Sequence, residues 1–181
     1  DYMTKENLVT GGRPFVDAFT SMIVAHIRGG LIDPEGSTLP QGWTSTDVGG
    51  VGPAGGASYD GTTFTVTGAG ADVWDAADAF HYNYLNISGD VDVIARVRDL
   101  AASDAWSKAG LMLRESLAPD AANYFIAASL LNGLFYQWRL QAGESSNYTP
   151  LMSASSGWLR IQRVGASIRL SLSVDGSEWM T

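Results

Sequence analysis

Three aspartates at regular spacing are the candidate metal ligands of this sequence. Asp72, Asp75 and Asp78 recur at every third residue in ADVWDAADAF. Carboxylate oxygens from one loop are ligands that Ca²⁺ prefers, although the DxDxDG spacing of the common calcium loop is absent. The aspartates therefore form a candidate calcium site, and an acidic turn that is merely solvated is the alternative.

Aromatic residues form the second candidate site. Sugar rings stack on the flat faces of tryptophan and tyrosine, while amide and charged groups bind the sugar hydroxyls. Trp74 and Trp106 lie near turns among polar neighbours, so we expect them to be exposed. Since a sandwich core consumes most aromatic residues, the alternative is that few of them meet solvent. The predicted carbohydrate-binding residues are Trp74, Trp106, Tyr124, Gln137 and Arg139.

Catalytic constellations are not evident. A glycosidase needs two carboxylates across a cleft, and the ExDxxE spacing that many sandwich hydrolases carry is absent. No GxSxG motif surrounds a serine, so a Ser-His-Asp arrangement is not expected, and His81 is interpreted as a partly buried sheet residue. Two isolated histidines and no cysteine argue against zinc. We expect a protein that is not an enzyme, with a glycan hydrolase as the minor alternative.

The elements that must position these residues are strands. From Trp43 onward apolar residues alternate with polar ones, as in 64–67 and 91–97. Asn132-Gly133 separates two such runs, which is a strong hairpin signal, and Gly165-Ala166 separates another pair. Short turns without intervening helices predict an all-β fold, an antiparallel sandwich or jelly roll.

The first part of the chain has a different pattern. Residues 14–28 show helical spacing of apolar residues after Pro14, and Gly29-Gly30 would end such a helix. A strand through Met22–Ile27 is the competing interpretation. We place a boundary near Leu39, so that 1–38 form an N-terminal helical or extended segment, or the tail of a preceding domain, and 39–181 form the sandwich.

The end of the sequence predicts an incomplete sheet. Val174-Asp175-Gly176-Ser177 has the composition of a hairpin turn, yet only four residues follow it. A strand without a partner leaves an exposed edge. We expect either that the last strands are missing or that a donor strand completes the sheet, with Ser21–Ile27 of this chain or of a neighbour as the candidate.

Composition excludes several kinds of partner. The chain has 181 residues, a net charge of −8 and no cysteine. This acidity argues against nucleic acid and anionic membranes as partners. The longest apolar run, Ser21–Ile27, is too short to span a bilayer.

Several ordered motifs over 39–181 together resemble one family. They are GAGADVWDAADAFHYNY, SGDVDVIARV, WSKAGLMLRES, YQWRL, GWLRIQRVG and SVDGSEW. This pattern resembles the DUF1349-type, concanavalin A-like β-sandwich family, whose members are appended to bacterial glycoside hydrolases such as β-xylosidases and to large secreted proteins. The resemblance implies a concanavalin A-like fold and an extracellular or cell-surface location. The family's final strands and any match for 1–38 are absent.

Three functions follow as expectations. The first is a non-catalytic carbohydrate-binding or accessory module of a secreted bacterial protein, with a polysaccharide or glycan and neighbouring domains as partners. The alternative is a structural or assembly module of the filament or surface-layer type, which self-associates by strand donation. A hydrolase is the third.

Overall fold

Strands make up all the regular structure of the computed structural model, which describes residues 3–4, 18–26, 39–101 and 104–181, the first two ranges as backbone only. Within these ranges no helix occurs. Over the same ranges no helix is long and apolar enough to cross a bilayer. The strands are β1 (Met3–Thr4), β2 (Ala18–His26), β3 (Thr44–Val48), β4 (Gly56–Tyr59), β5 (Phe64–Thr67), β6 (Val73–Trp74), β7 (Ala77–Asp78), β8 (Phe80–Ser88), β9 (Val91–Val97), β10 (Lys108–Arg114), β11 (Asn123–Ser129), β12 (Gly133–Arg139), β13 (Asn147–Met152), β14 (Gly157–Val164) and β15 (Ser167–Ser173).

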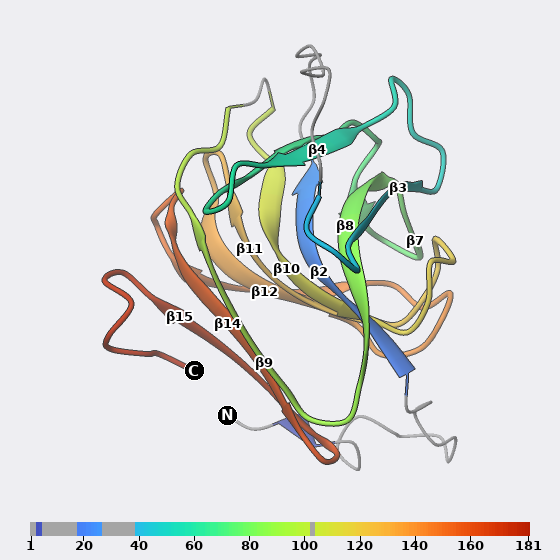
Figure 1. The fold of residues 1–181 in the computed structure, drawn as a ribbon. Coiled ribbons are helices and arrows are strands. Elements are labelled where there is room, and N and C mark those ends of the chain that lie inside the picture. The colour runs from blue at the N-terminus through green and yellow to red at the C-terminus, as the bar shows by residue number, and fades with distance from the viewer. Residues whose placement is uncertain (1–2, 5–17, 27–38, 102–103) are drawn as a thin grey trace.

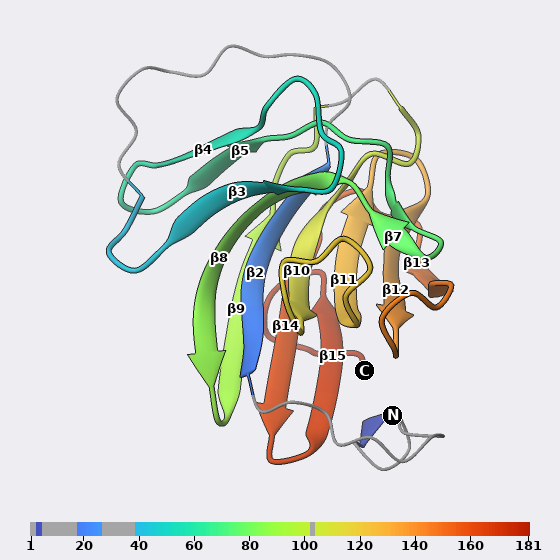
Figure 2. The ribbon, with the colours of Figure 1, turned by 90° about the vertical axis from the view of Figure 1, so that its right-hand side faces the viewer.

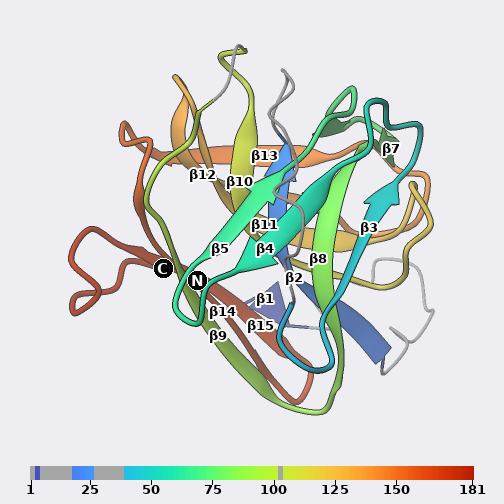
Figure 3. The same ribbon diagram turned by 45° about the horizontal axis from the view of Figure 1, so that its top comes forward.

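Two antiparallel sheets face each other (Figure 1). The seven-stranded sheet has the order β13-β12-β11-β10-β2-β8-β3, and the four-stranded sheet has the order β1-β15-β14-β9. Figure 2 shows the curved strands of the larger sheet spread across the view, with β14 and β15 of the smaller sheet overlapping them. The β4–β5 hairpin crosses one end of the molecule, above the larger sheet (Figure 3). The prediction of an antiparallel all-β sandwich is confirmed.

The main core lies between the two sheets. Alternate residues of each strand point to the same face of a sheet, so one set of side chains from β10, β11 and β12 meets one set from β14 and β15. The buried members of this core are Leu111, Leu113, Tyr124, Ile126, Ala128, Leu134, Leu159, Ile161, Ile168, Leu170 and Leu172. We call this side of the seven-stranded sheet its inner face.

The opposite, outer face of the seven-stranded sheet is buried as well. A second cluster of buried apolar residues lies there: Val48, Val73, Phe80, Tyr82, Met112, Phe125, Ala127 and Phe135. The β6–β7 hairpin contributes Val73 to this layer, and Tyr148 packs against it. Because both faces are covered, β10 and β11 are buried over almost their whole length.

The predicted hairpins are confirmed. β11 and β12 flank the turn at Asn132-Gly133, and β14 and β15 flank Gly165-Ala166. Gly133 has a φ of 78°, and a Cβ at this position would lie 2.1 Å from the carbonyl oxygen of Met152. A glycine is required there both by the backbone conformation and by the close approach of β13.

The N-terminal segment corrects one prediction. The expected helix over 14–28 is wrong, because residues 18–26 form the strand β2, in line with the competing interpretation. β2 pairs along its length with β10, from Thr20↔Arg114 to His26↔Lys108, and with β8 on its other side. Pairing on both edges satisfies the backbone of an apolar, β-branched run, and this tertiary effect overrides the weak helical spacing. The remaining residues of the predicted helix lie outside the described residues.

The outer edge of β15 has short partners. Met180 and Leu172 exchange two backbone hydrogen bonds of 2.9 Å, and Met3 of β1 pairs with Ile168. Most of the candidate donor segment, residues 21–26, lies in β2 of this same chain. It is placed between β8 and β10 in the larger sheet and not at the edge of β15.

Candidate functional site

A buried lysine organises the outer face of the seven-stranded sheet. Lys108, the first residue of β10, is 2% exposed. Its Nζ donates to Asp72 Oδ1 at 2.7 Å, to the carbonyl oxygen of Val73 at 2.9 Å and to Gln137 Oε1 at 3.3 Å. These acceptors match the three donors of an ammonium group, so the charge is fully bound by the fold.

Aromatic rings surround this ammonium. Nζ lies 5.7 Å from the ring centroid of Trp74, 5.8 Å from that of Trp106 and 5.9 Å from that of Phe135. A cation near the face of an aromatic ring is attracted by the ring quadrupole. Burial lowers the pKa of Lys108 below its ordinary value, and the neighbouring charge of Asp72 opposes this shift. Ion pairing and ring contacts therefore compensate for the lost hydration of the ammonium.

The rings also contact one another. Tyr148 of β13 lies edge-on to Trp106 at a centroid distance of 5.7 Å and to Trp74 at 6.4 Å, and it packs against Phe135 at 5.3 Å. Trp106 is 41% exposed, whereas Trp74 and Tyr148 are half-buried. We call Trp74, Trp106, Phe135 and Tyr148 the aromatic cluster. It presents a partly exposed aromatic surface, and the ammonium of Lys108 contacts three of its rings on the buried side.

A second buried charge group lies further along the outer face. Asp78 binds Arg139 through Oδ1 at 2.7 Å and Arg114 through Oδ2 at 3.1 Å, and all three side chains are fully buried. Arg139 also donates to the carbonyl oxygens of Asp75, at 2.9 Å, and Trp74, at 3.2 Å. This ion cluster, Asp78, Arg114 and Arg139, fastens the β6–β7 hairpin to the sheet and thereby positions Trp74.

The structure brings some of the predicted sugar-binding residues together and separates others. Trp74, Trp106 and Gln137 meet around Lys108, with Gln137 buried beneath the rings. Arg139 is enclosed in the ion cluster, so it has no free donor surface. Tyr124 points to the inner face and belongs to the main core, where burial raises the pKa of its hydroxyl. These last two residues are structural.

The three candidate calcium ligands do not converge. Asp72 pairs with Lys108, Asp78 pairs with two arginines, and Asp75 occupies a turn with φ 47°. Over the described ranges no group of three carboxylate, histidine or cysteine side chains is arranged to hold a metal ion. Two of the three aspartates, Asp72 and Asp78, bind buried cations of the sheet, and Asp75 is exposed in the turn between them.

Sequence reasoning missed the central roles of Lys108, Phe135 and Tyr148. The sequence offered one signal of a buried polar site: a lysine and a glutamine, Lys108 and Gln137, on the same face of two strands. The β6–β7 hairpin covers both residues, and the carbonyl oxygen of Val73 in this hairpin accepts a hydrogen bond from each of them.

A further polar group lies at the free edge of the seven-stranded sheet. His81 of β8 is a buried sheet residue, which agrees with its interpretation from the sequence. Its ring also joins Ser45 and Asp47 of β3, each at 2.7 Å. The sequence did not predict a Ser-His-Asp arrangement, because no local motif links these three residues. The pairing of β3 with β8 brings them together.

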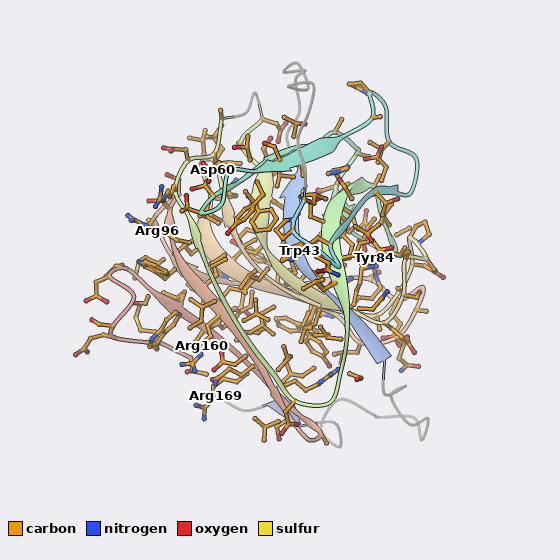
Figure 4. All side chains as sticks on the ribbon, in the orientation of Figure 1. Trp43, Asp60, Tyr84, Arg96, Arg160 and Arg169 are labelled. Atoms are coloured by element: carbon orange, nitrogen blue, oxygen red, sulfur yellow. The ribbon has the colours of Figure 1, made fainter. Side chains whose placement is uncertain are left out.

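The surface of the four-stranded sheet differs from both sites. Arg160 and Arg169 project from the side that faces away from the larger sheet (Figure 4). Arg160 pairs there with Asp92 of β9, and its Nε lies 2.8 Å from Oδ1.

Comparisons of this chain with protein-family models, with curated proteins and with solved structures found no match. The resemblance to the DUF1349-type family therefore stays a prediction. The structure and its geometry are what support a function.

Proposed function

We propose that this chain is a carbohydrate-binding or accessory module of a secreted protein, non-catalytic toward the glycan that it binds, acting outside the cell or at its surface. The observation that carries the proposal is the aromatic cluster. Trp106 is exposed over 41% of its surface and stands next to two half-buried rings. The side chain of Asp72, at the margin of the cluster, is 38% exposed and can accept hydrogen bonds from sugar hydroxyls.

The rigidity of the cluster supports binding. The rings of Trp74 and Trp106 are held by Lys108, whose three donors are all engaged. A surface that is ordered before the ligand arrives loses less conformational entropy on binding. A sugar ring could stack on Trp106 while its hydroxyls meet Asp72.

The family resemblance supports the same proposal from a different direction. The WSKAGLMLRES motif contains Trp106 and Lys108, two residues of the site. The resemblance implies a concanavalin A-like jelly roll that accompanies secreted glycoside hydrolases. An accessory role beside such an enzyme is the function we propose.

The test is retention on insoluble polysaccharides, with xylan, cellulose and β-glucan as the probes. We expect Trp106→Ala to weaken retention about 30-fold, because truncating a central aromatic contact costs roughly 2 kcal/mol or more. Trp179→Ala is the matched control, since Trp179 lies near Arg160, away from the cluster. Equal retention of both variants, with unchanged circular dichroism, would contradict the proposal.

A second candidate function rests on β2. This strand lies between β8 and β10 in the larger sheet and pairs with both of them. An assembly module could receive the same strand from a neighbouring copy.

A cysteine pair distinguishes the origin of the strand. Ala25 of β2 lies opposite Ala109 of β10, and the native chain has no cysteine. Oxidised Ala25→Cys/Ala109→Cys protein is expected to run as cross-linked multimers if the strand is donated between copies. A cross-linked monomer, together with a monomeric mass by light scattering, would exclude strand donation and favour the accessory module.

A further inference from the structure

Three side chains at the edge of the seven-stranded sheet form a hydrogen-bonded chain. The Oγ of Ser45 lies 2.7 Å from Nε2 of His81, and Nδ1 of His81 lies 2.7 Å from Oδ1 of Asp47. Ser45 is exposed, whereas His81 is 2% exposed. The buried imidazole thus lies between an exposed serine and a partly exposed aspartate, whose side chain is 26% exposed.

Chemistry fixes the direction of these hydrogen bonds. An ionised carboxylate can only accept, so the bond to Asp47 requires a proton on Nδ1 of His81. In the neutral imidazole Nε2 then carries the lone pair, and the Ser45 hydroxyl donates to it. This is the tautomer that a general base needs in order to take a proton from a serine.

Strand pairing and one glycine position the group. Asp47 lies opposite His81 in the β3–β8 register, and Ser45 is two residues before Asp47 on the same face. The backbone N–H of Gly55 donates to both oxygens of Asp47, at 3.2 Å each. A Cβ on Gly55 would lie 2.3 Å from the ring of His81, so only glycine allows the chain to cover the imidazole.

Asn83 gives an independent indication that this edge is not optimised for stability. It pairs with Ser45 across the strands, and its side chain is fully buried. Within the described part of the chain, neither Oδ1 nor Nδ2 of Asn83 has a hydrogen-bond partner. Leaving a buried amide unsatisfied costs about 1–3 kcal/mol, and such costs are concentrated at functional sites.

We propose that Ser45 is the nucleophile of an acyl-transfer site, with His81 as general base and Asp47 as the positioning residue. Ser45 Oγ bonds to the carbonyl carbon of an ester while its proton passes to Nε2 of His81. The bond between the carbonyl carbon and the alcohol oxygen breaks, and the alcohol leaves with that proton. Water then bonds to the acyl carbon and gives a proton to Nε2 of His81. The bond between this carbon and Ser45 Oγ breaks, His81 returns the proton to Oγ, and a carboxylic acid is released.

The surroundings point to an ester with a flat apolar part. Trp43, two residues before Ser45, packs on Phe64 of β5 at a centroid distance of 4.5 Å, and Phe64 packs on Tyr59 at 4.5 Å (Figure 4 labels Trp43). These half-buried rings provide an apolar surface close to the nucleophile. β3 is also the edge strand of the sheet, so every second residue directs its backbone N–H away from β8. Such an N–H is a donor for the oxyanion of the tetrahedral intermediate.

Covalent labelling of the native chain is the first test. A fluorophosphonate forms a bond between Ser45 Oγ and phosphorus and releases fluoride. We expect a single adduct by intact-protein mass spectrometry, mapped to Ser45 by peptide analysis and absent in Ser45→Ala and His81→Gln. Thr44→Ala, which removes the adjacent exposed hydroxyl, is expected to label like the native chain.

Hydrolysis of an aryl acetate is the second test. We expect Asp47→Asn to lower the turnover rate by about 10²–10⁴-fold, because an amide can donate to Nδ1 and so favours the wrong tautomer. Ser45→Ala is expected to abolish turnover with little change in the denaturation midpoint, which a purely structural network would not produce. If the folded native chain neither forms the adduct nor hydrolyses the ester above the rate of Ser45→Ala, the proposal is overturned.

Discussion

The two faces of the seven-stranded sheet are both buried, yet they are stabilised differently. The inner face meets the four-stranded sheet through aliphatic and aromatic side chains such as Leu113 and Ile126. The outer face buries charge: Lys108, Arg114 and Arg139 are covered by the β6–β7 hairpin and neighbouring loops. The comparison shows that polar alternation along a strand does not by itself mean exposure to solvent.

The difference has a physical cause. Apolar contacts on the inner face are non-directional and tolerate small shifts. A buried cation must instead have a partner at a defined position, because an unpaired buried charge is very costly. The positions of Asp72 and Asp78 are therefore fixed more strictly than those of the inner core residues. Because these aspartates flank Trp74, their fixed positions also position the aromatic cluster.

Removing the central anion of the outer face is expected to have the largest effect. Asp78→Ala leaves Arg114 and Arg139 buried without their carboxylate. We expect the free energy of unfolding to fall by about 3–5 kcal/mol, measured by urea denaturation. A loss below about 1 kcal/mol would mean that the two guanidinium groups find other acceptors, and the contrast between the faces would weaken.

Truncating the inner face is expected to cost somewhat less. Ile126 is fully buried between the sheets, and Ile126→Ala should lower the free energy of unfolding by about 2–5 kcal/mol through lost burial and the cavity that remains. Unlike Asp78→Ala, this variant should leave the fluorescence of Trp74 and Trp106 unchanged in the native state. A changed emission of Trp74 and Trp106, measured with the inner-face Trp138 replaced by phenylalanine, would show that the two faces are coupled.

One hydrogen bond between the sheets gives a pH-dependent test. The hydroxyl of Tyr136 donates to the carbonyl oxygen of Leu170 at 3.0 Å, so Tyr136→Phe should cost about 0.5–1.5 kcal/mol at neutral pH.

The same residue predicts the loss of stability in alkali. Burial raises the pKa of Tyr136 from 10.0 to about 12. The unfolded chain therefore loses this proton at a lower pH than the folded chain, and the contribution is complete below pH 10 and is lost between pH 10 and about 12. Stability of Tyr136→Phe should decline less over this interval than that of the native protein, and equal declines would contradict the assignment.

The exposed ion pair of the four-stranded sheet provides the smallest expected effect. Asp92 binds Arg160 and Gln162 on the surface, and the carboxylate side chain is 45% exposed. The bond to Arg160 holds the pKa of Asp92 below its ordinary value. We expect Asp92→Ala to cost about 0.2–1 kcal/mol, falling further in high salt, as measured by thermal denaturation. If Asp92→Ala lowered the free energy of unfolding as much as Asp78→Ala does, burial would not explain why the two ion pairs differ in stability.

Local patterns in the sequence are enough to predict most strands and hairpins of this protein. Alternation along 64–67 and 91–97, and the turns at Asn132-Gly133 and Gly165-Ala166, are local properties of the chain, since they depend on neighbouring residues and glycine conformations. They were sufficient to predict an antiparallel sandwich. The exposure of Trp106 also followed from its polar neighbours.

Which polar residues are buried, and which of them contact one another, depends on tertiary contacts. The helical spacing of 14–28 gave way to β2 because β8 and β10 offer partners on both sides. Two of the three aspartates near Trp74, Asp72 and Asp78, bind lysine and arginine side chains from β10 and β12. Ser45, Asp47 and His81 are joined by the pairing of β3 with β8. All of these contacts link residues distant in sequence, so their energies depend on register and burial that no local pattern carries.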